Sequence, residues 1–357
     1  MYLENCWYAA GWSEDLDQGL MDQTICGERV LIFRRADGAL AGLSGICPHR
    51  FASLSLGKRL EGDQIQCPYH GLVFDAEGHC LGGPFGQAPR SIALKTYEVV
   101  ERHSLIWVWR GAGEHADERL IPDFAVLEDS RLRTIRGRIR TNANFELITD
   151  NLMDLTHVGV VHEGGLGGAG LLNGQHSVLQ EGTTVYSDLW CPDGPPAPVW
   201  KALFSDYPEN VDHWLDMRWD APANMLLDVG VAPAGAARSG GISQWGANIL
   251  TPVSQTETLY LWASTRDFAL EDGAVDEMIR SAVDQAFALE DKPMIEDVQR
   301  NMAGRSFKEM RPVIMALDQG AIRARMMLAD LIAGKRVLSP TSPRPESTVA
   351  APATAFG

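Results

Sequence analysis

Two short clusters, Cys47-Pro48-His49 and Cys67-Pro68-Tyr69-His70, constrain this chain more than any other feature. Each cluster combines a cysteine with a histidine, and seventeen residues lie between them. A Rieske [2Fe–2S] centre needs this set of donors, because two thiolates hold one iron and two neutral imidazoles hold the other. The prolines restrict the backbone of both loops. The pattern therefore predicts a Rieske cluster bound by Cys47, His49, Cys67 and His70.

A structural zinc site with two cysteines and two histidines is the alternative for these residues. Zinc ligand pairs usually keep like residues together, whereas each loop here combines one cysteine with one histidine. Gly71 follows the second loop, where a side chain would crowd a backbone that passes close to the cluster. These features favour the iron–sulfur cluster over zinc.

The 357 residues suffice for two domains and a tail. Short strand-like runs broken by turns, such as Arg29–Arg34 followed by Asp37-Gly38, predict a β domain over residues 1–115. Residues 116–337 mix strand and helix patterns, so the predicted fold class is α+β. Residues 338–357 are rich in Pro, Ser, Thr and Ala, and we expect them to be disordered. Helices are expected at residues 145–161, 275–302 and 313–333.

A formal net charge of −16 argues against nucleic acid or an anionic membrane as the main partner. We find neither a readable signal peptide nor an apolar run long enough to span a bilayer. The other cysteines are scattered like reduced thiols of a cytoplasmic enzyme rather than a disulfide framework. They are Cys6, Cys26, Cys80 and Cys191.

A second candidate site contains Asp154, His157 and His162. Asp154 and His157 would share one face of a helix. His157 and His162 are five residues apart, so a regular helix would turn them about 140° from each other. They converge only if the helix ends or bulges between them, which Gly159 makes plausible. Alone, such a pair is more often hydrogen-bonded histidines, but a one-electron cluster needs a partner, and Fe(II) held by two histidines and one carboxylate suits that role.

The carboxylate should come from elsewhere in the chain. Asp291 lies on the apolar stripe of its expected helix, where an uncompensated charge would cost several kcal/mol. Pro293 should kink the helix nearby. A solvated face that includes Asp291 is an equally good interpretation of the helix alone, and Glu290 and Glu296 are the other candidates.

The cluster loops come first in the chain and the second candidate site follows. In this arrangement the chain resembles the oxygenase components of Rieske non-haem iron oxygenases, and among them the vanillate and dicamba O-demethylases. The resemblance covers nearly the whole chain except the tail. It rests on Trp7-Tyr8, Cys47–Arg50, Cys67–Gly71, Ile106–Trp109, Asp150–His157, His162, Ile249–Pro252 and Glu290-Asp291.

The resemblance implies a role for each site residue. Cys47, His49, Cys67 and His70 would bind the cluster, and His157, His162 and Asp291 would bind the mononuclear iron. Asp154 would bridge, by hydrogen bonds, His70 of one subunit to His157 of the next, although orienting His157 is a simpler role. Asn151 would lie close to the iron.

The implied catalytic domain is a helix-grip fold, an antiparallel sheet wrapped on a long helix. The implied assembly is a head-to-tail homotrimer, in which neighbouring subunits bring cluster and iron together. Electrons would enter from a separate flavin and iron–sulfur reductase that uses NADH or NADPH, because no Gly-rich dinucleotide fingerprint follows a strand. The run Gly164–Gly170 is interpreted instead as a flexible loop near the pocket mouth.

The expected reaction is O-demethylation of a vanillate-like methoxylated aromatic acid by O2, giving a phenol and formaldehyde. Hydroxylation of an aryl methyl group or of another aromatic acid is the alternative among enzymes. A protein that only transfers electrons is the alternative in another class, and it would not need the second metal site.

Three sets of residues are candidates for recognition. Arg50, Lys58 and Arg59 are either a basic patch that docks the reductase or ordinary solvated charges. The pocket aromatics would come from Trp190, Trp200, Phe204, Trp245, Trp262 and Phe287, which core packing explains equally well. The partner of a substrate carboxylate would come from Asn248, His213, Arg218 and Arg266.

Overall fold

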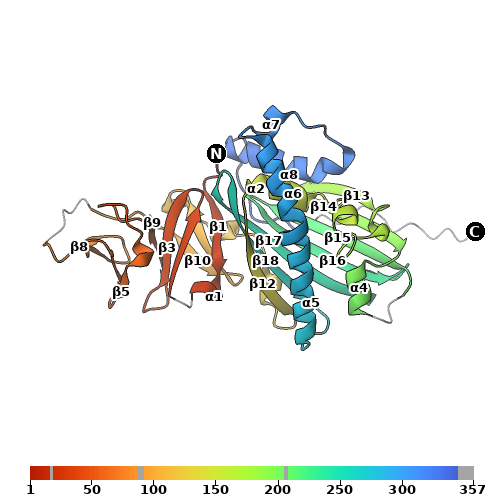
Figure 1. Ribbon diagram of the computed structural model, residues 1–357, viewed down its shortest axis with the longest axis horizontal. Coiled ribbons are helices and arrows are strands. Elements are labelled where there is room, and N and C mark those ends of the chain that lie inside the picture. Colours follow the sequence, from red (N-terminus) through yellow and green to blue (C-terminus); the bar gives the residue numbers. More distant parts are fainter. Residues whose placement is uncertain (17–18, 87–91, 205–207, 345–357) are drawn as a thin grey trace, which may run out of the picture.

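The first part of the chain forms three small antiparallel sheets (Figure 1). The structure is a computed structural model that describes residues 1–16, 19–86, 92–204 and 208–344. The sheets consist of short strands joined by turns, as the sequence predicted. They contain β1 (Cys6–Trp12), β11 (Leu105–Arg110) and β10 (Val99–Arg102); β2 (Leu20–Ile25), β3 (Glu28–Arg34), β4 (Leu40–Ser44) and β9 (Thr96–Tyr97); and β5 (Lys58–Leu60), β6 (Gln64–Gln66), β7 (Val73–Phe74) and β8 (Cys80–Gly82). The short helix α1 (Ser13–Leu16) follows β1.

The sheet β5–β8, which flanks the second cluster loop, lies at one end of the molecule, away from strands β12–β18 (Figure 1). This end has a small hydrophobic core of its own, which contains Cys47 and Cys67 together with Leu31, Phe33 and Phe74. Both cysteines are therefore held inside a packed core, separate from the larger core that contains residues of both domains.

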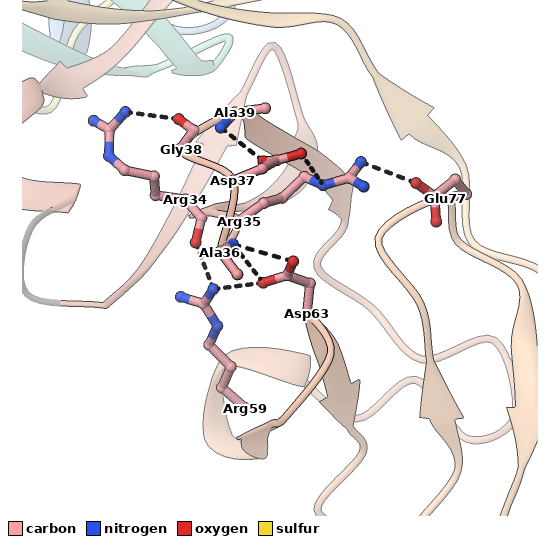
Figure 2. A network of polar contacts seen from close by, with 9 residues as sticks. All are labelled: Arg34, Arg35, Ala36, Asp37, Gly38, Ala39, Arg59, Asp63 and Glu77. Atoms are coloured by element: carbon pink, nitrogen blue, oxygen red, sulfur yellow. Dashed lines mark hydrogen bonds and ion pairs between the residues drawn. The ribbon is translucent and has the colours of Figure 1, made fainter.

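A network of polar contacts joins the β3–β4 hairpin to the strands beside the cluster loops (Figure 2). Arg59 Nη2 donates to Asp63 Oδ1 at 2.9 Å and to the carbonyl oxygen of Arg34. Arg35 pairs with Glu77 at 2.9 Å. Arg59 therefore has partners within its own domain, and its part in a basic docking patch stays a prediction.

The second part of the chain is built on one seven-stranded sheet. All neighbouring strands are antiparallel. The last six strands of the chain lie side by side in sequence order, as in a meander, and β12 pairs with the last of them, β18. In spatial order the strands are β12 (Arg133–Thr141), β18 (Glu257–Arg266), β17 (Ile242–Ser254), β16 (Asn224–Pro233), β15 (Val211–Asp220), β14 (Thr184–Gly194) and β13 (Gln175–Glu181).

A long helical segment crosses one face of this sheet (Figure 1). It consists of α5 (Gly273–Val283), a π-helical segment (Asp284–Asp291) and α6 (Lys292–Met302). The predicted α+β fold, with an antiparallel sheet and a long helix, is confirmed. The other helices are α2 (Phe145–Met153), α3 (Val158–Val161), α4 (Pro198–Leu203), α7 (Phe307–Met310) and α8 (Gln319–Ile332). None of the described helices combines the length and hydrophobicity needed to cross a lipid bilayer.

Different parts of the chain cover the two faces of the large sheet. Trp107 of the β domain packs in one cluster with Ile249 of β17 and Leu261 of β18. Successive side chains of a strand point to opposite faces. The neighbours Asn248 and Trp262 therefore face the long helix, and the candidate substrate site lies on that side.

Two of the predicted helices differ from the structure. The helix expected over residues 145–161 is interrupted at Asp154, whose φ of −89° and ψ of 90° end α2. The helix expected from residue 313 begins only at Gln319, because a tighter turn precedes it, in which Asp318 accepts from the N–H of Met315 at 2.7 Å. The helix expected over residues 275–302 is present, with an unforeseen π-helical segment inside it.

Residues 338–344 are held in place, contrary to the expectation of a disordered tail. Arg344 forms ion pairs with Asp188 at 2.7 Å and with Asp216 at 3.1 Å. The composition of the tail could not predict these contacts, because they depend on one arginine, Arg344, and on two aspartates of the distant sheet. The rest of the expected tail, residues 345–357, lies outside the described residues.

Candidate metal centres and substrate cavity

The two predicted cluster loops are closed in the same way. The N–H of Cys47 donates to the carbonyl of Ala52 at 2.9 Å, and the N–H of Cys67 donates to the carbonyl of Leu72 at 2.7 Å. Each bond spans five residues. The cysteine and the histidine therefore occupy equivalent places in both loops.

The residue four places after each cysteine adopts a left-handed backbone conformation. Phe51 has a φ of 60° and Gly71 a φ of 70°. The N–H of each donates back to the carbonyl of its cysteine, at 2.9 and 3.1 Å. Glycine takes this conformation without strain. A Cβ added at Gly71 would also lie 2.9 Å from Pro84, so the crowding expected there comes in part from a described side chain.

The four cluster residues present buried sulfur and more accessible nitrogen. Cys47 and Cys67 are only 1% and 2% exposed. The ring centroids of His49 and His70 lie 4.5 Å apart, and His49 is exposed. Burial, with a further contribution from the adjacent Cys67 thiol, raises the pKa of Cys47. Two adjacent buried thiols become thiolates readily only beside a cation. The residues therefore fit a [2Fe–2S] cluster whose histidine side faces the surface.

The structure brings together the second trio that the sequence singled out. The donor atoms of His157, His162 and Asp291 all lie within 4.8 Å of one another. Asp291 Oδ1 is 3.6 Å from His157 Nε2, and Asp291 Oδ2 is 3.3 Å from His162 Nε2. Adjacent ligands of one metal ion, with bonds of about 2.1 Å, are roughly 3 Å apart. The trio therefore has the spacing and the chemistry of a site for mononuclear Fe(II).

Both imidazoles present the same nitrogen to Asp291. Nδ1 of His157 donates to the carbonyl oxygen of Asp154. Nδ1 of His162 donates to Glu290 Oε2 at 2.6 Å. Because both acceptors are oxygens, each Nδ1 carries a hydrogen and each Nε2 keeps a free lone pair. Burial lowers the pKa of His162, but the carboxylates of Asp291 and Glu290 outweigh it and raise that pKa overall.

Two polar side chains hold the trio from outside. Asn151 Nδ2 donates to Asp291 Oδ1 at 3.2 Å, so the residue expected close to the iron contacts the carboxylate of the trio. Glu290 also accepts from Gln285 Nε2 at 2.9 Å. The sequence identified Glu290 only as an alternative ligand, and its contact with His162 was missed.

The π-helical segment explains why Glu290 and Asp291 can both face this site. Successive residues of an α-helix point about 100° apart, which would turn one of the two away. Here the N–H of Lys292 donates to the carbonyl of Phe287, five residues back. A π-helical turn holds an extra residue, and such turns occur often at functional sites. Pro293 follows at once, and its missing N–H fits the change of hydrogen-bond pattern.

Two other acidic residues have different contacts from those expected. Glu296 accepts from the N–H of Asn142 at 2.8 Å. The carboxylate of Asp154 accepts from the N–H and the hydroxyl of Thr156, at 3.0 and 2.6 Å. Within the chain it is therefore the carbonyl of Asp154, not its carboxylate, that orients His157.

A cavity of about 110 Å³ lies between the large sheet and the long helix. Leu166 lines it four residues after His162, and Phe287 lines it four residues before Asp291, so both segments that carry the trio also contribute to the cavity wall. The remaining lining residues are Val199, Trp200, His213, Leu215, Leu227, Val229, Gln244, Gly246, Asn248, Trp262, Ala263, Ser264, Ile279, Ala282 and Val283.

Half of the aromatic residues proposed for the pocket line this cavity. Trp200, Trp262 and Phe287 do so. Trp190 lies instead under the guanidinium of Arg238, with 5.1 Å to the ring centroid. Trp245 and Phe204 are not among the lining residues either, and the ring of Phe204 packs on another phenylalanine.

The candidates for binding a substrate carboxylate divide in the same way. His213 and Asn248 line the cavity. Arg218 does not, and it pairs with Asp220 at 2.8 Å. Arg266 is fully buried and pairs with Asp276 at 2.6 Å. The two candidate cations are therefore already matched by carboxylates.

The glycine-rich run after the metal trio is attached to it rather than free. The N–H groups of Gly165 and Gly167 donate to the carbonyl of His162 at 2.9 and 2.8 Å. A Cβ added at Gly167 would lie 1.8 Å from the carbonyl oxygen of Val158, so only glycine fits there. Leu166 within this run lines the cavity, as expected for a loop near its mouth, and Gly167 is tightly packed; the flexibility of the run stays a prediction.

Two protein-family models match the chain. The Rieske [2Fe-2S] domain matches residues 6–98, and the vanillate O-demethylase oxygenase C-terminal domain matches residues 141–334. Together they cover both candidate metal centres.

Characterised relatives match almost the full length of the chain. The oxygenase component of chloroacetanilide N-alkylformylase from Rhizorhabdus wittichii is 35% identical, over 92% of this chain and 95% of the relative. The oxygenase component of dicamba O-demethylase from Stenotrophomonas maltophilia is 35% identical, over 90% and 95%. Dicamba monooxygenase bound to 3,6-dichlorosalicylic acid superposes with a TM-score of 0.88 at 34% identity, over 94% of this chain and 98% of the other. A further structure of that enzyme, with a TM-score of 0.81, contains non-haem iron and dicamba.

Proposed function

The chain belongs to the Rieske oxygenase components with a vanillate O-demethylase C-terminal domain, and from this premise we propose that it removes an alkyl group from a heteroatom of an aromatic substrate. It is the terminal oxygenase of a multicomponent monooxygenase, with a [2Fe–2S] cluster and a mononuclear iron, and a separate reductase supplies its electrons. The observation that carries the proposal is the trio of His157, His162 and Asp291 together with a mainly apolar cavity lined from the same segments.

The leading form of this proposal is O-demethylation of a methoxylated aromatic acid. An aryl methyl ether, O2, two electrons and two protons would give a hemiacetal and water, and the hemiacetal would collapse to a phenol and formaldehyde. N-dealkylation follows the same balance with an aldehyde and an amine as products. The relative named for chloroacetanilide supports this second form.

Each site residue would have a defined task. His157, His162 and Asp291 would hold the iron, which supplies O2 activation when bound. Glu290 would keep the proton on Nδ1 of His162, and Asn151 would steady Asp291. The apolar cavity wall would exclude water while the substrate lies beside the metal rather than on it.

A homotrimer would bring each cluster to the iron of the next subunit. Apolar side chains are exposed on the β domain near the cluster, among them Phe51 (79%) and Tyr69 (65%). Others are exposed beside the trio, namely Val160 (69%) and Leu172 (58%). Contact between two such surfaces would bury both and place Asp154 between His70 of one subunit and His157 of the next.

Subunit mixing tests this arrangement. A Cys47→Ser variant would lack the cluster, and a His157→Ala variant would lack the mononuclear iron. Co-expressed in equal amounts, the two variants should recover about a quarter of wild-type activity, because one in four neighbouring pairs is functional in a random ring. No recovery would refute transfer between subunits.

Product analysis tests the function itself. The protein is supplied with a flavin and iron–sulfur reductase, NADH or NADPH, and methoxylated and N-alkylated aromatics. Formaldehyde or another aldehyde should appear in proportion to the O2 consumed. His157→Ala should abolish the product and the mononuclear iron while the Rieske spectrum remains. An electron-transfer protein would reduce an acceptor without any aldehyde, and that result would refute the proposal.

The reaction suits a reducing compartment. The four cysteines outside the cluster loops form no disulfide in the structure, and three of them are buried. Such thiols persist in the cytoplasm, where the reductase would also find its nicotinamide. A cytoplasmic location therefore forms part of the proposal.

A further inference from the structure

Ser264 places an unsatisfied hydroxyl in the wall of the cavity. Its side chain is 3% exposed, and its Oγ is buried without a hydrogen-bond partner among the described residues. Buried polar groups are nearly always hydrogen-bonded, and each orphan costs free energy. A ligand atom that accepts from Ser264 would remove this cost.

Gly246 leaves room for such a ligand. It is the register partner of Ser264 across β17 and β18, and both line the cavity. A Cβ added at Gly246 would meet only Leu227 Cβ at 3.7 Å and the amide nitrogen of Asn248 at 4.0 Å. The space opposite the Ser264 hydroxyl is therefore open.

Asn248 offers one more donor beside this space. Its Oδ1 accepts from the hydroxyl of Tyr260 at 2.5 Å, and its Nδ2 donates to the carbonyl of Gly246 at 3.1 Å. An amide nitrogen carries two hydrogens, so one N–H remains. The Gly246 carbonyl can only accept, so this contact fixes which end of the amide is the donor.

The cavity wall carries no positive charge. Among the described lining residues none is a lysine or an arginine. His213 is the only titratable base, and its Nε2 accepts from Trp200 Nε1 at 3.3 Å. Burial lowers the pKa of His213 to about 3, so its imidazole is neutral near pH 7.

The iron itself would add little positive charge. Its two charges would be offset by the carboxylates of Asp291, which lies against His157 and His162, and of Glu290, which lies against His162. An anionic ligand in the cavity would therefore find no unmatched cation. Burying such a charge is expensive.

We propose that the substrate is an uncharged aromatic compound with a hydrogen-bond acceptor, such as an amide carbonyl, and that Ser264 is the residue that selects for this acceptor. This inference rests on the proposed function and narrows it from aromatic acids to neutral aromatics. An aromatic acid would have to enter protonated. With a carboxyl pKa of about 4.3, only about one molecule in 500 is protonated at pH 7.

Three probes of similar shape test the inference: 4-methoxybenzamide, 4-methoxybenzoate and 4-methoxytoluene. Their binding to the iron-loaded oxygenase is measured by calorimetry at pH 7. The benzamide should bind at least tenfold more tightly than the benzoate. The ratio should not exceed about 500-fold, because about one benzoate molecule in 500 is protonated at pH 7 and could still bind. It should also bind about three- to tenfold more tightly than the toluene, which lacks an acceptor. Equal or tighter binding of the benzoate, or no binding of the benzamide, would overturn the inference.

Two serine variants separate recognition from stability. Ser264→Ala should weaken benzamide binding about three- to tenfold and leave toluene binding unchanged. Its melting temperature should be equal to or above that of the wild type, because the lost hydroxyl had no partner. Ser187→Ala is the matched control, since Ser187 Oγ is buried but donates to the carbonyl of Met153 at 3.1 Å. It should lower stability without changing the ratio of the two affinities. An equal loss of both ligands in Ser264→Ala would refute the role of Ser264.

Turnover with the reductase distinguishes this inference from the proposed function. If benzoate yields formaldehyde with a higher kcat/KM than benzamide, the neutral-substrate inference fails and the function stands. If the probes bind as predicted but an iron-replete enzyme yields no aldehyde from any ether or N-alkyl amide, the function fails and the cavity chemistry stands. Faster turnover of the benzamide supports both.

Discussion

The contact between Glu290 and His162 predicts how strongly the protein holds its mononuclear iron. Glu290→Gln keeps the shape of the side chain but removes its charge. A hydrogen bond to a charged group contributes about 1.5–3 kcal/mol. The Glu290 side chain is only 25% exposed, so solvent weakens the contact little. A loss of roughly 1.5–2 kcal/mol corresponds to a 10- to 30-fold rise in the dissociation constant for Fe(II), within the range known for residues that orient metal ligands.

The measurement uses the cluster as an internal standard. Wild type and variant are equilibrated anaerobically against a series of Fe(II) concentrations, and bound mononuclear iron is determined per Rieske cluster. The Rieske absorbance should be identical in both proteins. At saturating iron the variant should regain most of its activity, because the lost interaction positions a ligand and does not touch the substrate.

Glu296→Gln is the control for loosening of the long helix. Glu296 lies on the same segment and accepts from the N–H of Asn142. Its loss should lower the melting temperature and leave the iron affinity unchanged. Wild-type affinity in Glu290→Gln, or an equal loss in both variants, would refute the assignment of Glu290.

The remaining predictions concern stability and docking. Burial lowers the pKa of His213 to about 3, whereas the same side chain in the unfolded protein has a pKa near 6.5. The stability that the neutral imidazole provides is therefore complete above pH 6.5 and is lost as the pH falls. Urea unfolding should show about 2 kcal/mol less stability at pH 5 than at pH 7, and His213→Gln should reduce that difference. A chain that ends at residue 337 should melt at a lower temperature than one that ends at 344, because only the longer chain keeps the pair between Arg344 and Asp188. If Arg50 and Lys58 dock the reductase, changing both to glutamate should raise the apparent KM for reductase and leave the Rieske spectrum unchanged; an unchanged KM would rule the patch out.

Local spacing was enough to single out the candidate metal ligands. The alternation of cysteine and histidine in two Pro-containing loops is a chemical pattern, and it does not depend on the path of the chain between them. His157 and His162 were expected to converge through a break near Gly159, but residues 158–161 are helical, and the helix ends only at His162, where φ is −106°. Asp291 could not be chosen from its helix alone, because burial against a distant segment decides it.

Contacts set by long-range geometry were not predictable in this way. Glu290 reaches His162 only because the helix widens into a π-helical segment, and no residue pattern announces the extra residue. The order of residues 338–344 depends on Arg344 finding Asp188 and Asp216 on the sheet. The cavity shows the same limit: strand alternation places Asn248 and Trp262 on one face, but which arginines already have carboxylate partners is visible only after folding.

The widened turn before Pro293 has a mechanical consequence. Phe287 touches the cavity and Asp291 belongs to the iron trio, and a single uninterrupted stretch of backbone carries both. A ligand that displaces the phenyl ring of Phe287 should therefore also act on the backbone that positions the carboxylate of Asp291. Filling the cavity should therefore also shift Asp291, and the spectrum of a metal ion bound by the trio should change when a ligand binds, before any turnover.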